Sequence, residues 1–272
     1  MKNLAFLIKY IRYQFSAKTA HGIHSPFVFQ LYNEVINHKA NYYAFDRIEL
    51  LRNKLLQSND EIEVKDLGTG TSGKRKISLI AERAAKNKKY GELLYRLVNR
   101  FKPEIILELG TSLGISTAYL ASANPNSKVI TIEGCPSTAG AAKKCFEALG
   151  LKNIESVIGN FDFELKNVLE SGILASASPS SGGRNQESRI DFVFFDGNHK
   201  KEPTLNYFTQ CLEYAHNDSV FVFDDIHWSD EMEEAWEEIK KHPKVTVTID
   251  LFFLGIVFFR KEQVKENFIL KM

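Results

Sequence analysis

Residues 104–117 read EIILELGTSLGIST, a short apolar run that leads into a glycine-containing turn and then into a predicted helix. Within it, Glu108, Gly110 and Gly114 form the pattern E-x-G-x-x-x-G. Glycine lets the backbone turn sharply and approach a ligand closely, and the first N–H groups of the following helix are free to bind an anion. The stretch therefore predicts a nucleotide-binding strand, turn and helix.

A strand–glycine–helix turn alone can also be a plain structural connection. A second acidic residue supports the nucleotide-binding interpretation. Glu133 ends the predicted strand KVITIE, 23 residues beyond Gly110. Nucleotide-binding α/β sheets place a carboxylate there to bind the ribose hydroxyls. We therefore expect the turn to bind a nucleoside.

From residue 103 onwards, predicted strands and helices alternate. The continuously apolar runs IILEL, FVFF and VFVF are typical of strands that are covered on both faces. The last two strands are too close in sequence for a crossover helix, so they should pair antiparallel. We predict a doubly wound, seven-stranded, Rossmann-like α/β sheet with an antiparallel last strand. Its strands are expected at 105–109, 128–133, 154–158, 190–195, 219–224, 245–250 and 254–260, and its helices at 114–123, 137–149, 162–171, 201–214 and 229–241.

The first hundred residues are predicted to be mainly helical, with helices at 2–17, 26–38, 45–57, 74–87 and 90–101. We therefore divide the chain into a helical N-terminal extension or cap (1–102) and an α/β domain (103–272). In the first helix, apolar residues recur at helical spacing (Leu4, Leu7, Ile8, Ile11 and Phe15). This face is expected to pack on the body of the protein, and an interfacial membrane helix is the alternative.

Charge is distributed unevenly along the chain. Residues 1–100 carry 18 Lys/Arg and 9 Asp/Glu, whereas the remainder carries 17 and 25. The basic part could contact nucleic acid or an anionic membrane, but a solvated or docked surface is the favoured interpretation. There is no transmembrane run, and the three cysteines form no CxxC pair and suggest no disulfides, so a cytoplasmic location is expected.

Two further segments are rich in small residues. DLGTGTSG (66–73) imitates a nucleotide loop, but no strand ending in an acid follows it, so we interpret it as a turn that lines the substrate side. ASASPSSGGRNQESR (175–189) is predicted to be a flexible loop.

Acidic residues stand at or just after the ends of several predicted strands. Beyond Glu108 and Glu133 these are Asp162, Asp196 and the pair Asp224–Asp225. One such acid is commonly a helix cap, but several that converge would repel one another unless a cation lay between them. Asp196, Asp224 and Asp225 could supply three oxygen ligands to Mg²⁺ or a similar ion, the alternative being caps and solvated carboxylates.

Residues 103–260 resemble the class I S-adenosylmethionine-dependent O-methyltransferases. ILELGTSLGIS is similar to the first motif of the catechol and caffeoyl-CoA types, and FFDGNH with FDD is similar to the metal-binding set of these enzymes and of the macrocin-type sugar O-methyltransferases. The resemblance implies that Glu108, Gly110 and Ser116 surround the methionine part of the cofactor, that Glu133 binds the ribose, and that Asp162 in GNFD reaches the adenine amine. It also adds Thr111, Gly114, Gly134 and Asp196 to the cofactor-binding set.

The resemblance further implies catalytic roles after the fourth strand. Asp196, Asp224 and Asp225 would hold the metal, and Asp225 stands where the catechol type has asparagine. His199 occupies the position of the general base in the sugar type, whereas Lys200 is one residue away from the lysine of the catechol type. The alternative for His199 is a residue that orients the loop.

The favoured function is therefore metal-assisted O-methylation of a small hydroxylated molecule or sugar, with S-adenosylmethionine and Mg²⁺ or another divalent cation as cofactors. One alternative is a metal-independent RNA or protein methyltransferase, although the NPPY or DPPY motif of amino-group methyltransferases is absent. Another is a non-catalytic module that retains the cofactor fold. The expected partner is a small-molecule methyl acceptor, nucleic acid is not favoured, and a homodimer is compatible with the sequence.

Overall fold

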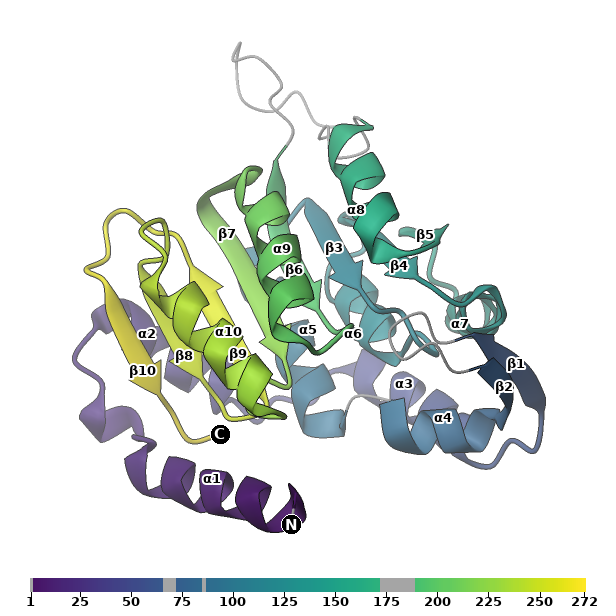
Figure 1. Ribbon diagram of the computed structural model, residues 1–272, viewed down its shortest axis with the longest axis horizontal. Helices are drawn as coiled ribbons and strands as arrows, with labels where there is room; N and C mark the ends of the chain where they lie inside the picture. Colours follow the sequence, from purple (N-terminus) through teal and green to yellow (C-terminus); the bar gives the residue numbers. More distant parts are fainter. Residues whose placement is uncertain (1, 66–71, 85–86, 172–188) are drawn as a thin grey trace. The chain divides into compact units, whose positions relative to one another are not determined.

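The computed structural model of the protein describes residues 2–65, 72–84, 87–171 and 189–272 (Figure 1). The segments 66–71 and 172–188 hold most of the two small-residue stretches predicted to be a turn and a flexible loop, and both predictions lie outside the described residues. The chain divides into two compact units. Unit 1 comprises Met1–Lys39 and Asp191–Met272, and unit 2 comprises Ala40–Ile190.

Three parallel strands form the centre of unit 2, namely β3 (Ile105–Leu109), β4 (Lys128–Glu133) and β5 (Ile154–Ile158). Every residue of β3 is buried, as its apolar sequence predicts. Each strand leads into a helix, in order α6 (Ile115–Ala123), α7 (Pro136–Leu149) and α8 (Phe161–Glu170). The carboxyl ends of the three strands lie along one edge, because the strands are parallel and adjacent.

The N-terminal part of unit 2 contains a β-hairpin that the sequence analysis missed. Strand β1 (Glu61–Lys65) pairs antiparallel with β2 (Ser72–Lys76), which occupies the start of the helix predicted at 74–87. Glu61 and Glu63 face Lys76 and Lys74 across the hairpin, so opposite charges pair across the two polar strands. The helices of this part are α3 (Tyr43–Leu56), α4 (Ile77–Ala84) and α5 (Lys88–Phe101).

Unit 1 contains the strands from β6 onwards. Strand β9 (Leu254–Phe258) runs antiparallel to both β7 (Ala215–Asp224) and β8 (Val247–Asp250), which confirms the predicted reversal. Strand β6 (Ile190–Phe195) is followed by α9 (Lys201–Leu212), and β7 is followed by α10 (Asp230–Lys241). In Figure 1, α9 and α10 lie in front of the strands of this unit.

The main sheet has one strand more than predicted. Its order is β10-β8-β9-β7-β6-β3-β4-β5, and the additional strand β10 (Glu266–Ile269) pairs parallel with β8. Three of the four residues of β10 are exposed, so the segment lacks the apolar run that identified the other strands. The α/β, Rossmann-like class predicted from the sequence is confirmed.

The N-terminal segment of unit 1 consists of α1 (Lys2–Ser16), a 3-10 turn (Ala20–Gly22), α2 (Pro26–Leu31) and a π-helical turn (Tyr32–Ile36) that continues α2. The predicted packing face of α1 is wrong. Leu4, Leu7, Ile8, Ile11 and Phe15 are exposed, whereas Phe6, Tyr10, Tyr13 and Ala17 pack against Phe252 and Phe253. The aromatic rings on α1 pack against the aromatic rings of Phe252 and Phe253. Helical spacing alone does not show which of two apolar faces of a helix is buried.

The first 39 residues pack with the C-terminal half of the chain. The Tyr13 hydroxyl donates to the Leu270 carbonyl oxygen, and Lys18 forms a parallel bridge with Leu270. The boundary predicted at residue 102 does not coincide with the boundaries of the two units. A cap formed by residues 1–102 stays a prediction. None of the described helices is both long enough and apolar enough to cross a bilayer.

Candidate functional site

The turn between β3 and α6 has the unusual backbone that its glycines predict. Gly110, Ser112 and Gly114 have φ values of 106°, 47° and 79°, in the left-handed region that favours glycine. A Cβ atom on Gly114 would lie 2.4 Å from Cε1 of Phe146 on α7. Gly114 is therefore required by backbone conformation and by helix packing, and its predicted contact with the cofactor stays a prediction.

Glu108 lies on β3 and is completely buried. Its Oε2 atom accepts hydrogen bonds from the hydroxyls of Thr117 on α6 and Thr131 on β4, the latter at 2.7 Å. Thr111 in the turn continues this network, because its hydroxyl lies 2.6 Å from that of Thr131. Among the described residues, no hydrogen-bond partner faces the other oxygen, Oε1. A buried acceptor without a donor is unfavourable, and the contact of Glu108 with the methionine part of the cofactor stays a prediction.

Burial raises the pKa of Glu108 to about 7, although the side chains of Ser116, Thr117 and Thr131 counteract this shift. Nearby Glu133 adds a smaller rise through charge repulsion. A cation placed at Oε1 would favour the ionised form and lower this pKa. The protonation state of the Glu108 carboxyl group would therefore change when a positively charged ligand binds beside it.

Glu133 ends β4 and is held by two backbone N–H groups. Ser112 N donates to Oε2 at 2.8 Å, and Cys135 N donates to Oε1 at 2.9 Å. The first bond joins the β3–α6 turn to the end of β4. Such a fixed carboxylate can accept hydrogen bonds from a ribose diol, as the sequence predicts.

The remaining predicted cofactor residues occupy three places in unit 2. Ser116 is buried in the first turn of α6, and Gly134 follows Glu133 at the edge of the sheet. Asp162 is exposed in the first turn of α8, where its N–H donates to the capping side chain of Asn160 at 3.0 Å. Because α6 follows β3 and α8 follows β5, the predicted residues are spread along the carboxyl edge of β3, β4 and β5. Their individual contacts with a cofactor stay predictions.

In unit 1, a histidine joins two of the predicted metal ligands. Asp196, His199 and Asp224 each offer one ligand atom, and these atoms lie within 4.8 Å of one another. His199 Nε2 is 3.9 Å from Asp196 Oδ1. Ligand atoms around an octahedral Mg²⁺ with bonds of about 2.1 Å lie roughly 3–4 Å apart, so a small closure would complete the set. Carboxylate oxygens suit Mg²⁺ or Mn²⁺, whereas an imidazole nitrogen suits Zn²⁺ and other transition metals better than Mg²⁺.

The structure does not place Asp225 in this group. Its φ of 54° is left-handed, and its N–H donates to the Phe253 carbonyl oxygen at 2.7 Å. The role of Asp225 as a ligand therefore stays a prediction, as does that of Lys200, which is exposed at the start of α9.

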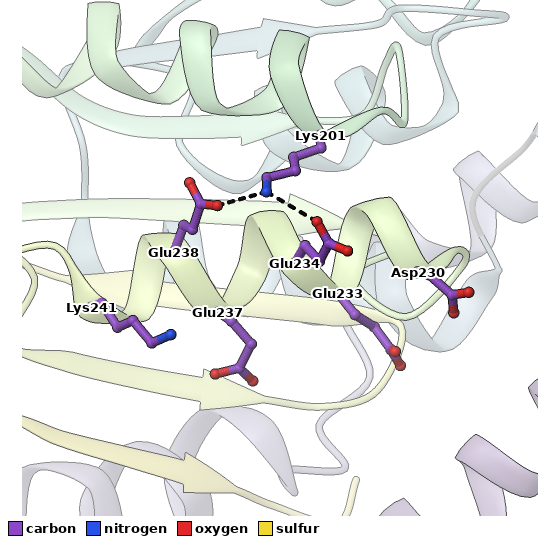
Figure 2. Close-up of a pocket in the computed structure, with 7 residues that line it drawn as sticks. All are labelled: Lys201, Asp230, Glu233, Glu234, Glu237, Glu238 and Lys241. Atoms are coloured by element: carbon purple, nitrogen blue, oxygen red, sulfur yellow. Dashed lines mark hydrogen bonds and ion pairs between the residues drawn. The ribbon is translucent and has the colours of Figure 1, made fainter.

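The loop that carries His199 is held at both ends. Asn198 adopts a left-handed φ of 54°, and its side chain donates to the Tyr207 hydroxyl at 3.2 Å. Lys201 forms ion pairs with Glu234 at 3.0 Å and Glu238 at 2.7 Å, which connect the start of α9 to α10 (Figure 2). These contacts fix the backbone on each side of His199.

A surface pocket lies along α10, but it contains none of the predicted site residues. Figure 2 shows its acidic side chains and its two lysines, with Lys201 paired to two of the acids. The pairing makes this a charged helix face and gives no substrate site. The lining residues are Lys201, Asp230, Glu233, Glu234, Glu237, Glu238 and Lys241.

His227, two residues after Asp225, was not among the predicted site residues. Its ring nitrogens lie 2.9 Å from Glu233 Oε1 and 2.7 Å from Asp250 Oδ2, and its ring stacks on Phe252. Burial opposes the charged ring, but the two carboxylates outweigh it and raise the pKa of His227. The imidazole therefore ties the loop after β7 to the end of β8. The missed signal was Asp250 at the end of β8, since acids at or after the ends of five other predicted strands were identified.

The comparisons with known proteins agree with these motifs. Residues 107–226 match the family described as "Methyltransferase domain". This stretch is similar to that family. It contains the β3–α6 turn, Glu133 and the group Asp196, His199 and Asp224. The resemblance to class I S-adenosylmethionine-dependent O-methyltransferases is confirmed.

Curated relatives match parts of the chain. A catechol O-methyltransferase of Niastella koreensis is 30% identical over 138 residues, which cover 50% of this chain and 55% of the relative. An Aspergillus flavus O-methyltransferase, imqG, is 25% identical over 120 residues, or 44% of each chain. The human transmembrane O-methyltransferase is 37% identical over 73 residues, covering 26% of this chain and 25% of the relative. The chain spans about half the length of these relatives or less.

Solved structures show that the fold around the methyltransferase domain is shared. An O-methyltransferase from Bacillus cereus, solved with SAH, has a TM-score of 0.53 at 18% identity and covers 80% of this chain and 92% of its own. TomG of Streptomyces achromogenes, an O-methyltransferase of tomaymycin synthesis solved with SAM, has a TM-score of 0.53 at 18% identity, with 86% and 95% covered. At these identities the likeness concerns the fold.

Proposed function

We propose that the protein is an S-adenosylmethionine-dependent O-methyltransferase that acts on a small hydroxylated molecule or sugar with the help of a divalent cation. The observation that carries the proposal is the pairing of Glu108 and Glu133 at the ends of adjacent parallel strands, one with a buried free acceptor atom and one fixed by two backbone N–H groups. The relatives named as O-methyltransferases, and the S-adenosylmethionine in a structural neighbour, support the choice of cofactor.

Binding and orientation of the donor are the tasks of unit 2. Glu133 accepts from the ribose hydroxyls, and Glu108 Oε1 accepts from the ammonium group. The other predicted contacts of this unit come from Gly110, Thr111, Gly114, Ser116, Gly134 and Asp162, and Asp196 of unit 1 is the remaining predicted cofactor residue. The sulfonium of S-adenosylmethionine supplies an already activated methyl group. The protein therefore contributes mainly by aligning the reactants, an effect of up to roughly 7–11 kcal/mol in ideal cases.

Deprotonation of the acceptor hydroxyl is the task of unit 1. Asp196 and Asp224 would hold the cation, with Asp225 as the predicted third ligand, and the cation would lower the pKa of a nearby hydroxyl. His199 is proposed to accept the proton, which contributes about 10²–10⁴-fold in comparable enzymes. Its place beside Asp196 also suits a metal ligand, and one ring nitrogen cannot serve both purposes at once. Lys200 is the second candidate for the base.

A turnover assay tests the proposal. The purified protein is incubated with S-adenosylmethionine and a panel of phenols, catechols and sugars, and S-adenosylhomocysteine is measured with and without EDTA. We expect turnover of at least one hydroxylated acceptor, its loss on chelation and its recovery with Mg²⁺ or Mn²⁺. Turnover that is unaffected by EDTA would remove the cation from the mechanism.

The alternatives give different results in the same assay. A metal-independent RNA or protein methyltransferase would methylate macromolecules in the presence of EDTA, and its binding to RNA would weaken with salt. A non-catalytic module would bind S-adenosylmethionine without turnover on any acceptor.

A further inference from the structure

The outer face of α1 carries a stripe of exposed apolar side chains, defined as Leu4, Leu7, Ile8, Ile11 and Phe15. Their exposed fractions range from 43% for Ile8 to 88% for Phe15. The spacing of three or four residues places them one above another on a single side of the helix. Isolated exposed apolar residues are ordinary, but a continuous apolar patch usually marks an interaction surface.

The opposite face of the helix is fixed to the body of unit 1. Phe6, Tyr10 and Tyr13 pack on Phe252 with ring centroids 4.9–5.2 Å apart. Lys9 adds ion pairs with Asp230 at 2.7 Å and Glu233 at 3.0 Å. Since successive residues turn by roughly 100°, the stripe lies roughly opposite the docked residues. The helix cannot bury the stripe by rotation without losing these contacts.

The helix that carries the stripe is basic. Residues 1–18 contain four basic residues and no acidic one. Lys9 is engaged with the body, but Arg12 and Lys18 are exposed. An apolar helix face flanked by basic residues suits the surface of an anionic bilayer, where the apolar side chains enter the headgroup–acyl boundary and the cations attract the lipid headgroups. Pairing with a second copy would instead bring two basic helices together.

We propose that α1 binds an anionic lipid bilayer in the plane of its surface, with the stripe in contact with lipid and the aromatic face holding the rest of unit 1. The partner is a lipid surface with negatively charged headgroups. The proposal does not depend on the methyltransferase reaction, so either can fail without the other.

Vesicle co-sedimentation of the full chain tests the proposal. The probes are vesicles of phosphatidylcholine alone and vesicles that also contain phosphatidylserine. We expect the protein to sediment with the anionic vesicles, to bind the neutral ones at least about fivefold more weakly, and to dissociate as salt is raised, because charge attraction near the surface is screened.

Variants on the two kinds of surface make the test specific. The triple variant Leu7→Gln, Ile11→Gln, Phe15→Gln should reduce partitioning at least about tenfold, and Arg12→Gln about fivefold. The matched control is Phe29→Gln on α2, since Phe29 is 46% exposed but lies outside the stripe, and it should leave partitioning unchanged. Circular dichroism and melting temperatures should agree among all the proteins, because the substitutions leave the docked face intact.

Three outcomes would overturn the proposal. The first is equal binding to neutral and anionic vesicles, or none to either. The second is a triple variant that binds as well as the unsubstituted protein, or a Phe29→Gln control that loses as much. The third is a concentration-dependent dimer that the triple variant abolishes without any vesicle binding, which would assign the stripe to a second copy of this chain.

Discussion

The carboxylates around the β3–α6 turn of unit 2 have different surroundings from those after β6 and at the end of β7 in unit 1. In unit 2, Glu108 and Glu133 are held apart in fixed positions, one by threonine hydroxyls and the other by backbone N–H groups. In unit 1, Asp196 and Asp224 gather around His199 with their ligand atoms within 4.8 Å. A neutral donor network suits a polar organic ligand, whereas clustered anions suit a cation. The contrast predicts different ligands for the two groups, and substitution of a residue that belongs to one group alone should affect only the ligand of that group.

The largest effect is expected at the acidic group. Asp224→Asn keeps the shape of the side chain but removes its charge, so turnover should fall by about 10²–10³-fold, equivalent to the several kcal/mol that a bound cation supplies. The dissociation constant for S-adenosylmethionine should change by less than about twofold, because Asp224 belongs to the other site. Steady-state kinetics and calorimetry check the two quantities. An Asp224→Asn enzyme with full turnover would contradict the separation.

The next largest effect is expected on cofactor binding, at Glu133. Glu133→Gln removes a charged acceptor, and such hydrogen bonds contribute about 1.5–3 kcal/mol, so S-adenosylmethionine should bind about 10–100-fold more weakly. Cation affinity, measured by titration with Mn²⁺, should stay the same. The two sites would not be independent if the variant lost both ligands equally.

A smaller effect is expected from pH. The folded protein keeps a proton on Glu108 up to about pH 7, whereas the unfolded chain releases it near pH 4.5, so this group lowers the free energy of unfolding as pH rises through that window. An ammonium ligand requires the ionised form. Affinity for S-adenosylmethionine should therefore rise about tenfold from pH 6 to pH 8, which follows from the ionised fraction at a pKa of about 7.

Glu108→Gln provides the control for this measurement. The amide does not titrate, so the additional pH dependence of binding and of thermal stability should disappear, and proton uptake or release measured in buffers of different ionisation enthalpy should fall accordingly. An identical pH profile in both proteins would show that Glu108 is not the titrating group.

The smallest effect should come from the residues that hold Glu108. Thr117→Val removes one donor to Oε2, which typically costs about 1 kcal/mol, so S-adenosylmethionine should bind about fivefold more weakly and the melting temperature should fall by a few degrees. Ser122 on the same helix is not part of the network, and Ser122→Ala serves as the comparison. Equal losses of affinity and of melting temperature in both variants would mean that the substitutions act only by destabilising α6.

Much of the fold could be predicted, because β3, β4, β6, β7 and β9 are apolar runs separated by helical patterns. The strands that were missed lack this signal. Strands β1 and β2 are stabilised by pairing of charged residues across the hairpin, and β10 is mostly exposed, so only their partners reveal them. The packing face of α1 was wrong for a related reason, since both of its faces are apolar and only the body decides which one docks.

The candidate site shows the same division. Glu108, Gly110 and Glu133 follow from a local motif and the end of the next strand, and the structure brings their strands together. Thr131 could not be identified, because its contact with Glu108 arises from the register of two separate strands. The group of Asp196, His199 and Asp224 does not include Asp225, whose left-handed backbone no sequence spacing reveals.

The most direct test of the account is calorimetric titration of the purified protein with S-adenosylmethionine, in parallel with Glu133→Gln. The account predicts one molecule bound per chain, a melting temperature that rises with ligand concentration, and weaker binding by the variant. An absence of heat and of any thermal shift at saturating ligand, or identical affinities in the two proteins, would contradict it.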